Sequence, residues 1–311
     1  MACTLITGGA GFIGSHLATK LVELGHSTRV MDNFATGHRS NLEHIRDKID
    51  LLEADFRKPE DCLRACDGIE YIFHEGAIPS VPKSVDKPRE SHDANINGTF
   101  NMLQAAVHHK VRRFIYAASS SAYGNTEESP KHEGMKSSPL SPYAAQKHAG
   151  ETYCRSFTEC FGLETISLRY FNVFGPRQDP KSQYAAAIPA FVTAILTGQS
   201  PMVYGDGEQT RDFSYIDNVV HGNILAMKAA KTGGESVNVA CGGQVSVNQV
   251  IAAINEALGT DVKPEYQAHR PGDVMHSCAS IELAGKLLGY ETVVPFEEGL
   301  RRAIDYYRTP V

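Results

Sequence analysis

The chain has 311 residues, of which 42% are apolar, and its formal net charge is −6. This length exceeds what one hydrophobic core usually supports, so we expect two unequal lobes in a globular protein. The acidic balance argues against a nucleic-acid-binding protein, although it allows a local phosphate site. No apolar run is long enough to span a bilayer, and the first strand pattern begins too early for a signal peptide, so we expect no membrane partner.

The seven cysteines are scattered along the chain and form no C-x-x-C pair. Cys62 and Cys66 are spaced to share a helical face, but no second pair with zinc spacing accompanies them. We therefore expect reduced thiols, no metal site and a cytoplasmic location.

Short apolar runs alternate with helical patterns through the first half of the chain. The runs predict strands at 3–9, 27–33, 49–56, 68–77, 111–121 and 163–175. Helical patterns separate these strands, and one of them begins with Ser141 as N-cap and Pro142 at its first position. Such alternation predicts an α/β fold with a doubly wound parallel sheet of the Rossmann type.

The pattern becomes irregular after Phe174. Residues 175–189 are typical of a polar loop, and 201–216 predict short strands with a turn at Gly205–Gly207. From Val245 onward, helical and loop patterns are mixed. We predict a sheet domain over 1–172, with a returning segment near 210–240, and a smaller α/β lobe over 173–311.

The stretch "TGGAGFIGSH" joins the first predicted strand to the first predicted helix. Its Gly8, Gly11 and Gly14 allow backbone N–H groups and the helix N-terminus to approach a pyrophosphate. Asp32 ends the next strand, where a carboxylate accepts the ribose hydroxyls of NAD and repels the 2′-phosphate of NADP. A glycine-rich turn alone also occurs for steric reasons, but this combination predicts a site for NAD.

Tyr143 and Lys147 lie four residues apart in "SPYAAQK", so both side chains leave the same helical face. A tyrosine acts as a base only when its pKa falls from about 10 towards neutrality, and a neighbouring ammonium favours that change. Ser119 stands at the end of the fifth predicted strand, where open parallel sheets bind ligands. We interpret these residues as a catalytic set in which Ser119 relays a hydrogen bond between a substrate hydroxyl and the phenol.

Five stretches together resemble the extended short-chain dehydrogenase/reductases, in particular the nucleotide-sugar 4-epimerases: "TGGAGFIGSH", "MDNFATGH", "ASSSAYG", "SPYAAQK" and "RYFNVFGPRQDP". The UDP-N-acetylglucosamine 4-epimerases resemble the chain most, through "SVPKS", "QDPKSQYAAAIP", "GDGEQTRDFSYI" and "PGDVMHS". The resemblance runs essentially from end to end. It implies NAD as cofactor, a UDP-sugar as substrate, and the catalytic roles for Ser119, Tyr143 and Lys147.

The resemblance also implies which residues contact the two ligands. The cofactor contacts fall on Gly8, Gly11, Phe12, Ile13, Gly14, Asp32, Asn33, Asp55, Phe56, Ala77, Asn95, Tyr143, Lys147 and Tyr170. The substrate contacts fall on Ser80, Ser119, Ser120, Tyr143, Asn172, Ala186, Ala187, Tyr204, Arg211, Arg270, Asp273 and Ser277. Two arginines suit a pyrophosphate, because guanidinium groups pair well with phosphate oxygens.

Glu75 departs from the family pattern, in which a small or neutral residue is usual at this position. A carboxylate that pointed inward would oppose the phosphates, so we expect Glu75 to point away from the site. Related dehydratases carry an acid pair after the serine or threonine, and related decarboxylases carry a glutamate there, whereas Ser120 and Ser121 are not acids. This comparison favours reversible oxidation at C4 of the sugar, with Tyr143 taking the 4-hydroxyl proton.

One position bears on the identity of the sugar. In the family, a bulky residue beside the C2 substituent restricts the enzyme to plain hexoses, and this position falls on Ser277. A serine leaves room for an acetamide, which favours UDP-GlcNAc and UDP-GalNAc, with UDP-Glc and UDP-Gal as further substrates. The alternatives are a UDP-glucose or a UDP-glucuronate 4-epimerase, since Arg177 or Lys83 could meet a carboxylate. A catalytically silent nucleotide-sugar-binding protein is a different class, and it would lack part of the catalytic set.

Two predicted helices, 97–109 and 143–157, carry apolar side chains away from the face of Tyr143 and Lys147. As the family usually does, two subunits would pair these helices into a four-helix interface, so we predict a homodimer. The contributing residues would be Phe100, Leu103, Ala106, Ala145, Ala149, Tyr153 and Phe157. The alternative is that these side chains belong to the core against the sheet.

Overall fold

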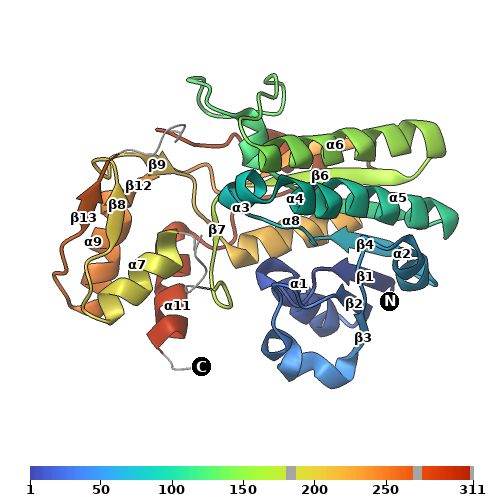
Figure 1. Cartoon of the computed structure of the whole chain (residues 1–311), viewed down its shortest axis with the longest axis horizontal. Coiled ribbons are helices and arrows are strands. Elements are labelled where there is room, and N and C mark those ends of the chain that lie inside the picture. The colour runs from blue at the N-terminus through green and yellow to red at the C-terminus, as the bar shows by residue number, and fades with distance from the viewer. Residues whose placement is uncertain (180–186, 269–274, 309–311) are drawn as a thin grey trace.

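A computed structural model of the chain describes residues 1–179, 187–268 and 275–308. Its centre is a seven-stranded parallel sheet in the order β11-β6-β5-β4-β1-β2-β3, with helices on both faces (Figure 1). The strands are β1 (Cys3–Thr7), β2 (Ser27–Asp32), β3 (Ile49–Glu53), β4 (Tyr71–His74), β5 (Arg113–Ser119), β6 (Glu164–Tyr170) and β11 (Glu235–Val239). The strand order reverses between β1 and β4, where doubly wound sheets bind ligands, so the predicted fold class is confirmed.

The sheet is buried on both faces, because successive strand residues point into two different apolar layers. Ile72 and Phe114 lie in the layer under α2 (Pro59–Cys66), α5 (Thr99–His108) and α6 (Pro142–Phe161). Phe73 and Ile115 lie in the layer shared with α1 (Phe12–Glu23) and α8 (Ile216–Lys228). Short helical segments cover the loops: η1 (Arg39–Lys48), α3 (Val81–Asp86), α4 (Pro88–His92), the π-helical η2 (Asp93–Gly98) and η3 (Ser120–Tyr123).

Apart from α8 and β11, the later part of the chain forms three small two-stranded sheets and four helices within the described residues. Its strands are β7 (Val173–Phe174), β8 (Met202–Tyr204), β9 (Thr210–Arg211), β10 (Ser214–Tyr215), β12 (Val245–Ser246) and β13 (Glu265–Gln267). Its helices are α7 (Ala187–Leu196), α9 (Val247–Leu258), α10 (Glu282–Leu288) and α11 (Phe296–Arg308). The predicted turn between short strands is confirmed, since Gly205 and Gly207 both have positive φ, 85° and 79°.

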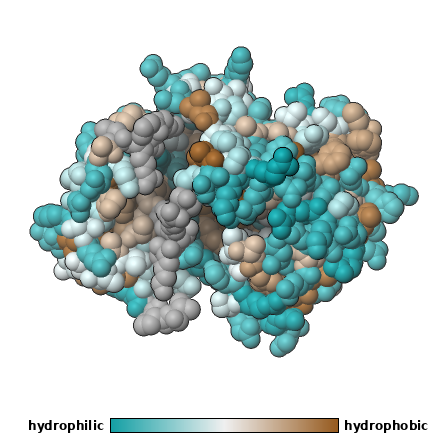
Figure 2. Space-filling model, in the orientation of Figure 1, coloured by the Kyte–Doolittle hydropathy of each residue, from teal (hydrophilic) through white to brown (hydrophobic). Residues whose placement is uncertain are grey.

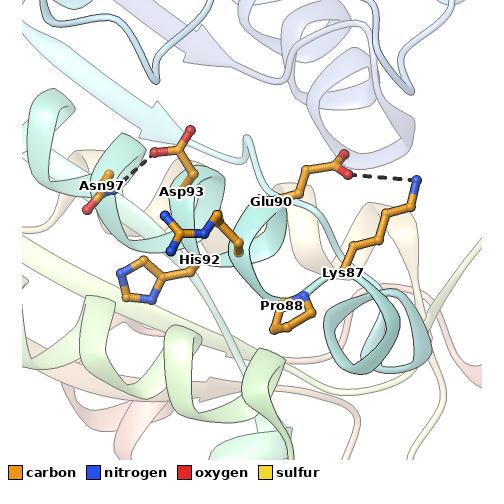
Figure 3. A pocket seen from close by; sticks show the side chains of 7 residues that line it. Lys87, Pro88, Glu90, His92, Asp93 and Asn97 are labelled. Carbon is orange, nitrogen blue, oxygen red and sulfur yellow. Dashed lines mark hydrogen bonds and ion pairs between the residues drawn. The ribbon is translucent and has the colours of Figure 1, made fainter.

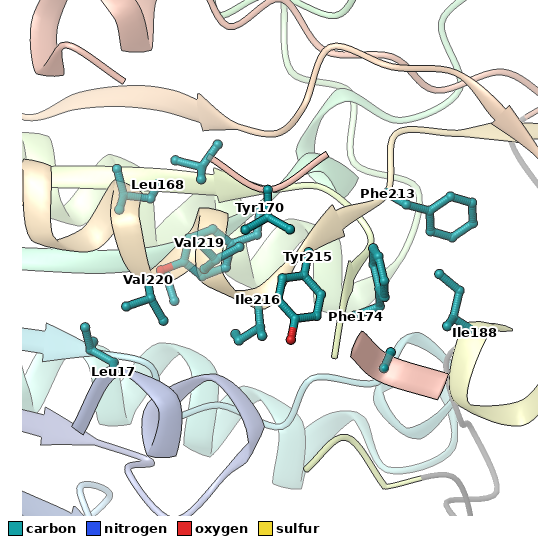
Figure 4. Packing of buried hydrophobic residues seen from close by; sticks show 14 of the residues in the cluster. Leu17, Leu168, Tyr170, Phe174, Ile188, Phe213, Tyr215, Ile216, Val219 and Val220 are labelled. Atoms are coloured by element: carbon teal, nitrogen blue, oxygen red, sulfur yellow. The ribbon is translucent and has the colours of Figure 1, made fainter. Parts of the chain in front are cut away.

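One apolar cluster joins the large sheet to the later part of the chain. Figure 4 shows Leu168 and Tyr170 of the sheet near Val219 of α8, with Phe174 and Tyr215 continuing the packing towards α7. The later residues also complete the sheet, because β11 pairs with β6. The division into a 1–172 domain with a returning segment near 210–240 and a 173–311 lobe stays our proposal.

The strand predicted over 163–175 is interrupted. β6 ends at Tyr170 and β7 begins at Val173, because Asn172 adopts a left-handed backbone conformation with φ of 33°. Asparagine tolerates this region better than most residues, and the pattern of apolar residues does not reveal such a break. The interruption turns the chain out of the sheet at the edge where the site lies.

The face of the molecule shown in Figure 2 is largely hydrophilic where it is coloured, with apolar residues among the polar ones. In the described parts of the chain, every helix is too short or too polar to cross a bilayer.

Candidate active site

The glycine turn follows β1 directly and packs against the loop after β4. Gly8 has φ of 65°, and a Cβ on it would lie 2.7 Å from the Cα of Gly76. A Cβ on Gly14 would lie 2.7 Å from the Cα of Gly9, inside the turn itself. No side chain caps the helix at Gly11, so the amides of Phe12 and Ile13 begin a helix whose positive end faces this edge of the sheet. The turn thus forms a backbone cradle that fits a pyrophosphate.

Asp32 is buried at the end of β2, where it joins two loops. Its carboxylate accepts hydrogen bonds from the amides of Ala10, at 2.9 Å, and Phe34, at 2.8 Å. Burial raises the pKa of Asp32, and these two bonds oppose that rise. A carboxylate has about four acceptor positions, so Asp32 retains capacity for ribose hydroxyls.

Asn33 and Asp55 bring the ends of β2 and β3 together. The Asn33 amide donates to Asp55 at 3.1 Å, and Arg57 donates to the same carboxylate. Burial opposes ionisation of Asp55, but the hydrogen bonds from Arg57 and Asn33 outweigh it and lower its pKa to about 2. Asp55, a predicted cofactor contact, is therefore negatively charged at neutral pH.

Phe56 lies between two close-packed glycines of the same region. A Cβ on Gly98 or on Gly76 would collide with the Phe56 ring, so both positions require glycine for this packing. Gly98 ends the π-helical segment η2, which also carries Asn95. A π-helical turn of this kind is frequent at functional sites.

Asn95 connects the loop after β4 to α6. Its side chain accepts from the amide of Ile78 at 2.8 Å and donates to the carbonyl of Ile78 at 3.2 Å. It also donates to Gln146 at 2.9 Å. Ala77 lies next to Ile78, so Asn95 fixes the path of the predicted cofactor loop. The sequence did not predict that Gln146 belongs to this hydrogen-bond network, because nothing in "SPYAAQK" indicates a contact between its side chain and Asn95.

Tyr143 and Lys147 leave the first turns of α6, as predicted. Ser141 caps the helix by accepting from the amide of Ala144 at 3.2 Å, and the amide of Tyr143 donates to Ser84 at 3.1 Å. Burial raises the pKa of Tyr143, and a hydrogen bond with Ser119 opposes that rise. The structure also gives Ser119 a hydrogen bond from the hydroxyl of Ser121, at 2.9 Å.

Lys147 lies beneath the carboxyl end of β5. Its ammonium donates to the carbonyl of Ala117 at 2.7 Å and lies 5.0 Å from the centre of the Tyr116 ring. Burial lowers the pKa of Lys147 to about 8, while the negative charge of Glu75 raises it. At neutral pH the ammonium form predominates, which is the form that favours an ionised phenol nearby.

Two features seat α6 against the sheet, and neither was predicted. A Cβ on Gly150 would collide with the hydroxyl of Tyr116, so glycine allows the helix to approach β5 closely. The next residue, Glu151, accepts two bonds from Arg169 of β6, at 2.8 and 2.7 Å, in a buried pair. Such bidentate pairing fixes orientation as well as distance, so it holds the catalytic face of α6 at the edge of the sheet.

Glu75 points inward, so the expectation that it points away was wrong. Its Oε1 accepts a hydrogen bond from the hydroxyl of Tyr170 at 2.8 Å. Burial raises the pKa of Glu75 to about 7, although Tyr170 and the charge of Lys147 lower it. The carboxylate therefore occupies the region between the end of β4 and the end of β6, next to the predicted cofactor contacts.

Three of the predicted substrate contacts lie in loops that follow strands of the large sheet, namely Ser80 after β4, Ser120 after β5 and Asn172 after β6. Ser120 begins η3 directly after Ser119. Ser80 caps α3 by accepting from the amide of Lys83 at 3.1 Å. Asn172 donates to the carbonyl of Asp212 at 3.0 Å, which ties the break after β6 to the segment between β9 and β10.

The remaining described contacts lie in the smaller lobe. Tyr204 ends β8, Arg211 ends β9 and Ala187 begins α7. The amide of Ser277 donates to the carbonyl of Thr210 at 3.1 Å, which places Ser277 beside the strand of Arg211. Three predicted contacts lie outside the described residues: Ala186, Arg270 and Asp273.

A surface hollow over α4 and η2 belongs to a different part of the molecule. Lys87, Glu90, His92, Asp93 and Asn97 are among the residues that line it (Figure 3). Its polar groups pair with each other: Lys87 lies 4.0 Å from Glu90, and the Asn97 amide donates to Asp93 at 3.0 Å. None of the predicted catalytic residues lines it.

A doubly wound sheet with a glycine turn at its switch point and a serine, a tyrosine and a lysine at the adjacent strand ends defines a dinucleotide-dependent short-chain dehydrogenase/reductase. Comparison with known proteins gives the particular family. Residues 4–240 match the model of the NAD dependent epimerase/dehydratase family, and the chain belongs to this family. The predicted cofactor, NAD, is confirmed by this membership.

Three relatives illustrate the similarity. A UDP-glucose 4-epimerase from Mycolicibacterium smegmatis is 35% identical over 98% of both chains. The structure of a UDP-N-acetylglucosamine 4-epimerase from Methanobrevibacter ruminantium, in complex with UDP-N-acetylmuramic acid, is 36% identical, covers 99% of this chain and 98% of its own, and superimposes with a TM-score of 0.94. A UDP-glucuronic acid 4-epimerase from Bacillus cereus is 30% identical over 98% and 99%, with a TM-score of 0.92. Decarboxylases and dehydratases of nucleotide sugars match as well.

Proposed function

We propose that the protein is an NAD-dependent 4-epimerase of UDP-hexoses that interconverts UDP-GlcNAc and UDP-GalNAc, and UDP-Glc and UDP-Gal as further substrates. The observation that carries the proposal is the set formed by Ser119, Tyr143 and Lys147 at the switch-point edge, followed by the neutral Ser120 and Ser121. A base and an ammonium at one edge suit proton transfer at a sugar hydroxyl. The absence of an acid after Ser119 gives no group for elimination or decarboxylation at that position.

The residues divide the work of the reaction among them. Bound NAD supplies a reversible hydride acceptor. Tyr143, ionised beside the Lys147 ammonium, takes the proton of the 4-hydroxyl, and Ser119 holds that hydroxyl in line with the phenol. After the resulting 4-keto sugar has turned over, Tyr143 returns the proton while the hydride adds to the opposite face. Throughout, the UDP group stays held, with Arg211 and Arg270 as its proposed phosphate partners.

The contacts of Arg177 and Lys83, the two cations that could meet a carboxylate, make UDP-glucuronate a less favoured substrate. Arg177 donates to the hydroxyls of Ser15 and Thr19 on α1, both at 3.3 Å. Lys83 pairs with Glu90 at 3.5 Å. Because both cations already have partners on the protein, a UDP-glucuronate 4-epimerase is an alternative rather than the main proposal. A plain UDP-glucose 4-epimerase is the other alternative. A catalytically silent binding protein is the different class, which the complete catalytic set disfavours.

The function is tested by following the anomeric protons of each UDP-sugar by NMR, with wild-type protein and with Ser277→Tyr. We expect the wild type to epimerise the acetylated pair. In the variant, a ring beside the C2 substituent overfills the site, which typically costs about 1–3 kcal/mol, or roughly a five- to hundredfold loss in kcat/KM. The loss should fall on UDP-GlcNAc and UDP-GalNAc and largely spare UDP-Glc and UDP-Gal.

The hexose pair serves as the internal control of this experiment. If Ser277→Tyr lowers kcat/KM equally for both pairs of sugars, Ser277 is a structural position, and the preference for acetylated sugars loses its local support. If the wild type turns over only UDP-glucose or only UDP-glucuronate, the corresponding alternative replaces the main proposal. If it turns over none of them, the silent binding protein replaces it.

We also propose a cytoplasmic homodimer, formed through α5 and α6. Part of the predicted interface was wrong, because Leu103, Ala106 and Phe157 are buried in the layer against the sheet. The ring of Phe100, however, packs 5.5 Å from that of Tyr153, which is 38% exposed, and Phe161 on the same helix is 60% exposed. An exposed aromatic row of this kind suits a partner helix pair.

Light scattering at micromolar concentration should give twice the chain mass for the wild type. Tyr153→Asp places a charge in the aromatic row, so we expect this variant to give the mass of one chain. Tyr266→Asp, at an exposed tyrosine on β13, is the matched control and should remain dimeric. A monomeric wild type would contradict the proposed assembly.

A further inference from the structure

Glu75 is a partly buried carboxyl group that the proposed reaction does not use. Its Oε2 is inaccessible to solvent and has no hydrogen-bond partner among the described residues. An unpaired carboxylate oxygen is costly to bury, so such a group in a native protein calls for an explanation. One explanation is a ligand that supplies positive charge or a donor group when it binds.

The orientation of Glu75 is fixed by a buried chain of hydrogen bonds. The side-chain amide of Asn223, on α8, donates to the hydroxyl of Tyr170 at 2.8 Å and to the carbonyl of Val219 at 2.9 Å. Since the Tyr170 oxygen accepts from Asn223, its own hydrogen goes to Oε1 of Glu75, at 2.8 Å. The chain thereby leaves Oε2 as the carboxyl oxygen without a hydrogen-bond partner among the described residues.

The surroundings of Glu75 are those proposed for the nicotinamide half of the cofactor. Gly76, its neighbour, packs against Gly8 of the glycine turn. Ala77 follows, and Tyr170 and Lys147 close the region from β6 and α6. Each of these positions, apart from Gly76, is a predicted cofactor contact.

The charges around this region are few. His74 is neutral at physiological pH, because burial lowers its pKa to about 3. Lys147 faces Glu75, Cys154 and Glu151, of which Glu151 is already paired with Arg169. Glu75 faces Tyr170 and Lys147. Among the described groups, Glu75 is therefore the carboxylate left to balance the ammonium of Lys147.

We propose that Glu75 is a positioning residue whose carboxylate balances the positive charges of Lys147 and of the oxidised nicotinamide ring, and so biases the bound cofactor towards NAD⁺ over NADH. The inference rests on the proposed function, since it assumes that the nicotinamide lies at this edge. The oxidised ring and the ammonium are both cations, and a nearby anion reduces their mutual repulsion in a buried site. The reduced ring is neutral and gains less, so Glu75 favours return of the hydride to the sugar.

The test is the partition of the two cofactor forms on full-length protein. Wild type, Glu75→Gln and Glu70→Gln are each equilibrated with a known mixture of NAD⁺ and NADH, and the bound ratio is measured after release from the protein. Glu75→Gln keeps the shape and loses the charge, so we expect its bound NAD⁺:NADH ratio to fall about tenfold. That fall corresponds to about 30 mV for a two-electron couple. Glu70→Gln changes an exposed glutamate just before β4 and should leave the ratio unchanged.

A second measurement needs no variant. In the wild type, Glu75 ionises near pH 7, so the preference for NAD⁺ should increase between about pH 5.5 and 7.5, where Lys147 remains mostly charged. A bound ratio that is equal in wild type and Glu75→Gln, or flat over this pH range, overturns the inference.

Epimerase activity of the wild type, measured in parallel, separates the two claims. If the wild type epimerises UDP-sugars but the bound NAD⁺:NADH ratio is the same in wild type and Glu75→Gln, this inference alone is overturned. A wild type that shows the Glu75-dependent ratio but no epimerisation supports the inference and overturns the proposed function.

Discussion

Replacing Tyr143 by phenylalanine should lower turnover by about a hundredfold or more while UDP-sugar binding survives, because general acid–base catalysis contributes on this scale. The ring remains and the amide bond to Ser84 is a backbone contact, so the first turn of α6 keeps its position. Only the group that exchanges the proton is lost. The measurement is kcat for the preferred UDP-sugar, with binding followed by calorimetry.

The matched control is Tyr153→Phe, which removes a phenolic hydroxyl from the same helix outside the site. It should epimerise as the wild type does. Near-normal turnover by Tyr143→Phe would exclude Tyr143 as the base, whereas loss of both binding and turnover would assign it a structural role.

Lys147→Met should lower turnover at pH 7 by about ten- to a thousandfold if its ammonium favours the Tyr143 phenolate as proposed, because an opposite charge nearby changes a pKa by about 1–3. Burial already raises the pKa of Tyr143, and removing the ammonium leaves nothing to favour the phenolate from α6. Less phenolate is present at pH 7, so activity should recover as the pH rises. The pH profile of kcat should therefore shift to higher pH.

Lys20→Met is a suitable control, since Lys20 is an exposed lysine on α1 that pairs with Glu23. Its pH profile should match that of the wild type. If Lys147→Met loses activity equally at every pH, Lys147 holds the cofactor or the helix without acting on the phenol.

The elements predicted well are those specified by neighbouring residues. The glycine turn, the cap at Ser141 and the spacing of Tyr143 and Lys147 are all local, so the sequence alone was enough to predict their geometry. Asp32 followed from its place at the end of a strand, since parallel strands end at one edge.

The elements missed are those that depend on residues far apart in the chain. The inward orientation of Glu75 is set by Tyr170, 95 residues later, and through it by Asn223. The seating of α6 depends on Arg169 meeting Glu151 across a strand. Such contacts have no periodicity or spacing by which a single sequence reveals them.

The predicted interface shows a related difficulty. Leu103 lies in the sheet-facing layer, while Phe100, one turn earlier on the same helix, is only partly buried. Both are apolar, and the pattern of apolar residues does not separate a face that meets the core from a face that meets another subunit.

The apolar cluster that runs from the sheet through α8 to α7 has a consequence for motion. Because Tyr170, Val219 and Phe174 belong to one close-packed layer, a hinge motion that separated the large sheet from the smaller lobe would expose that layer to water. We therefore expect the large sheet and the smaller lobe to keep nearly the same relative position during each catalytic cycle. The sugar then presents its second face by rotating about the bonds of its own diphosphate, while the protein around it stays rigid.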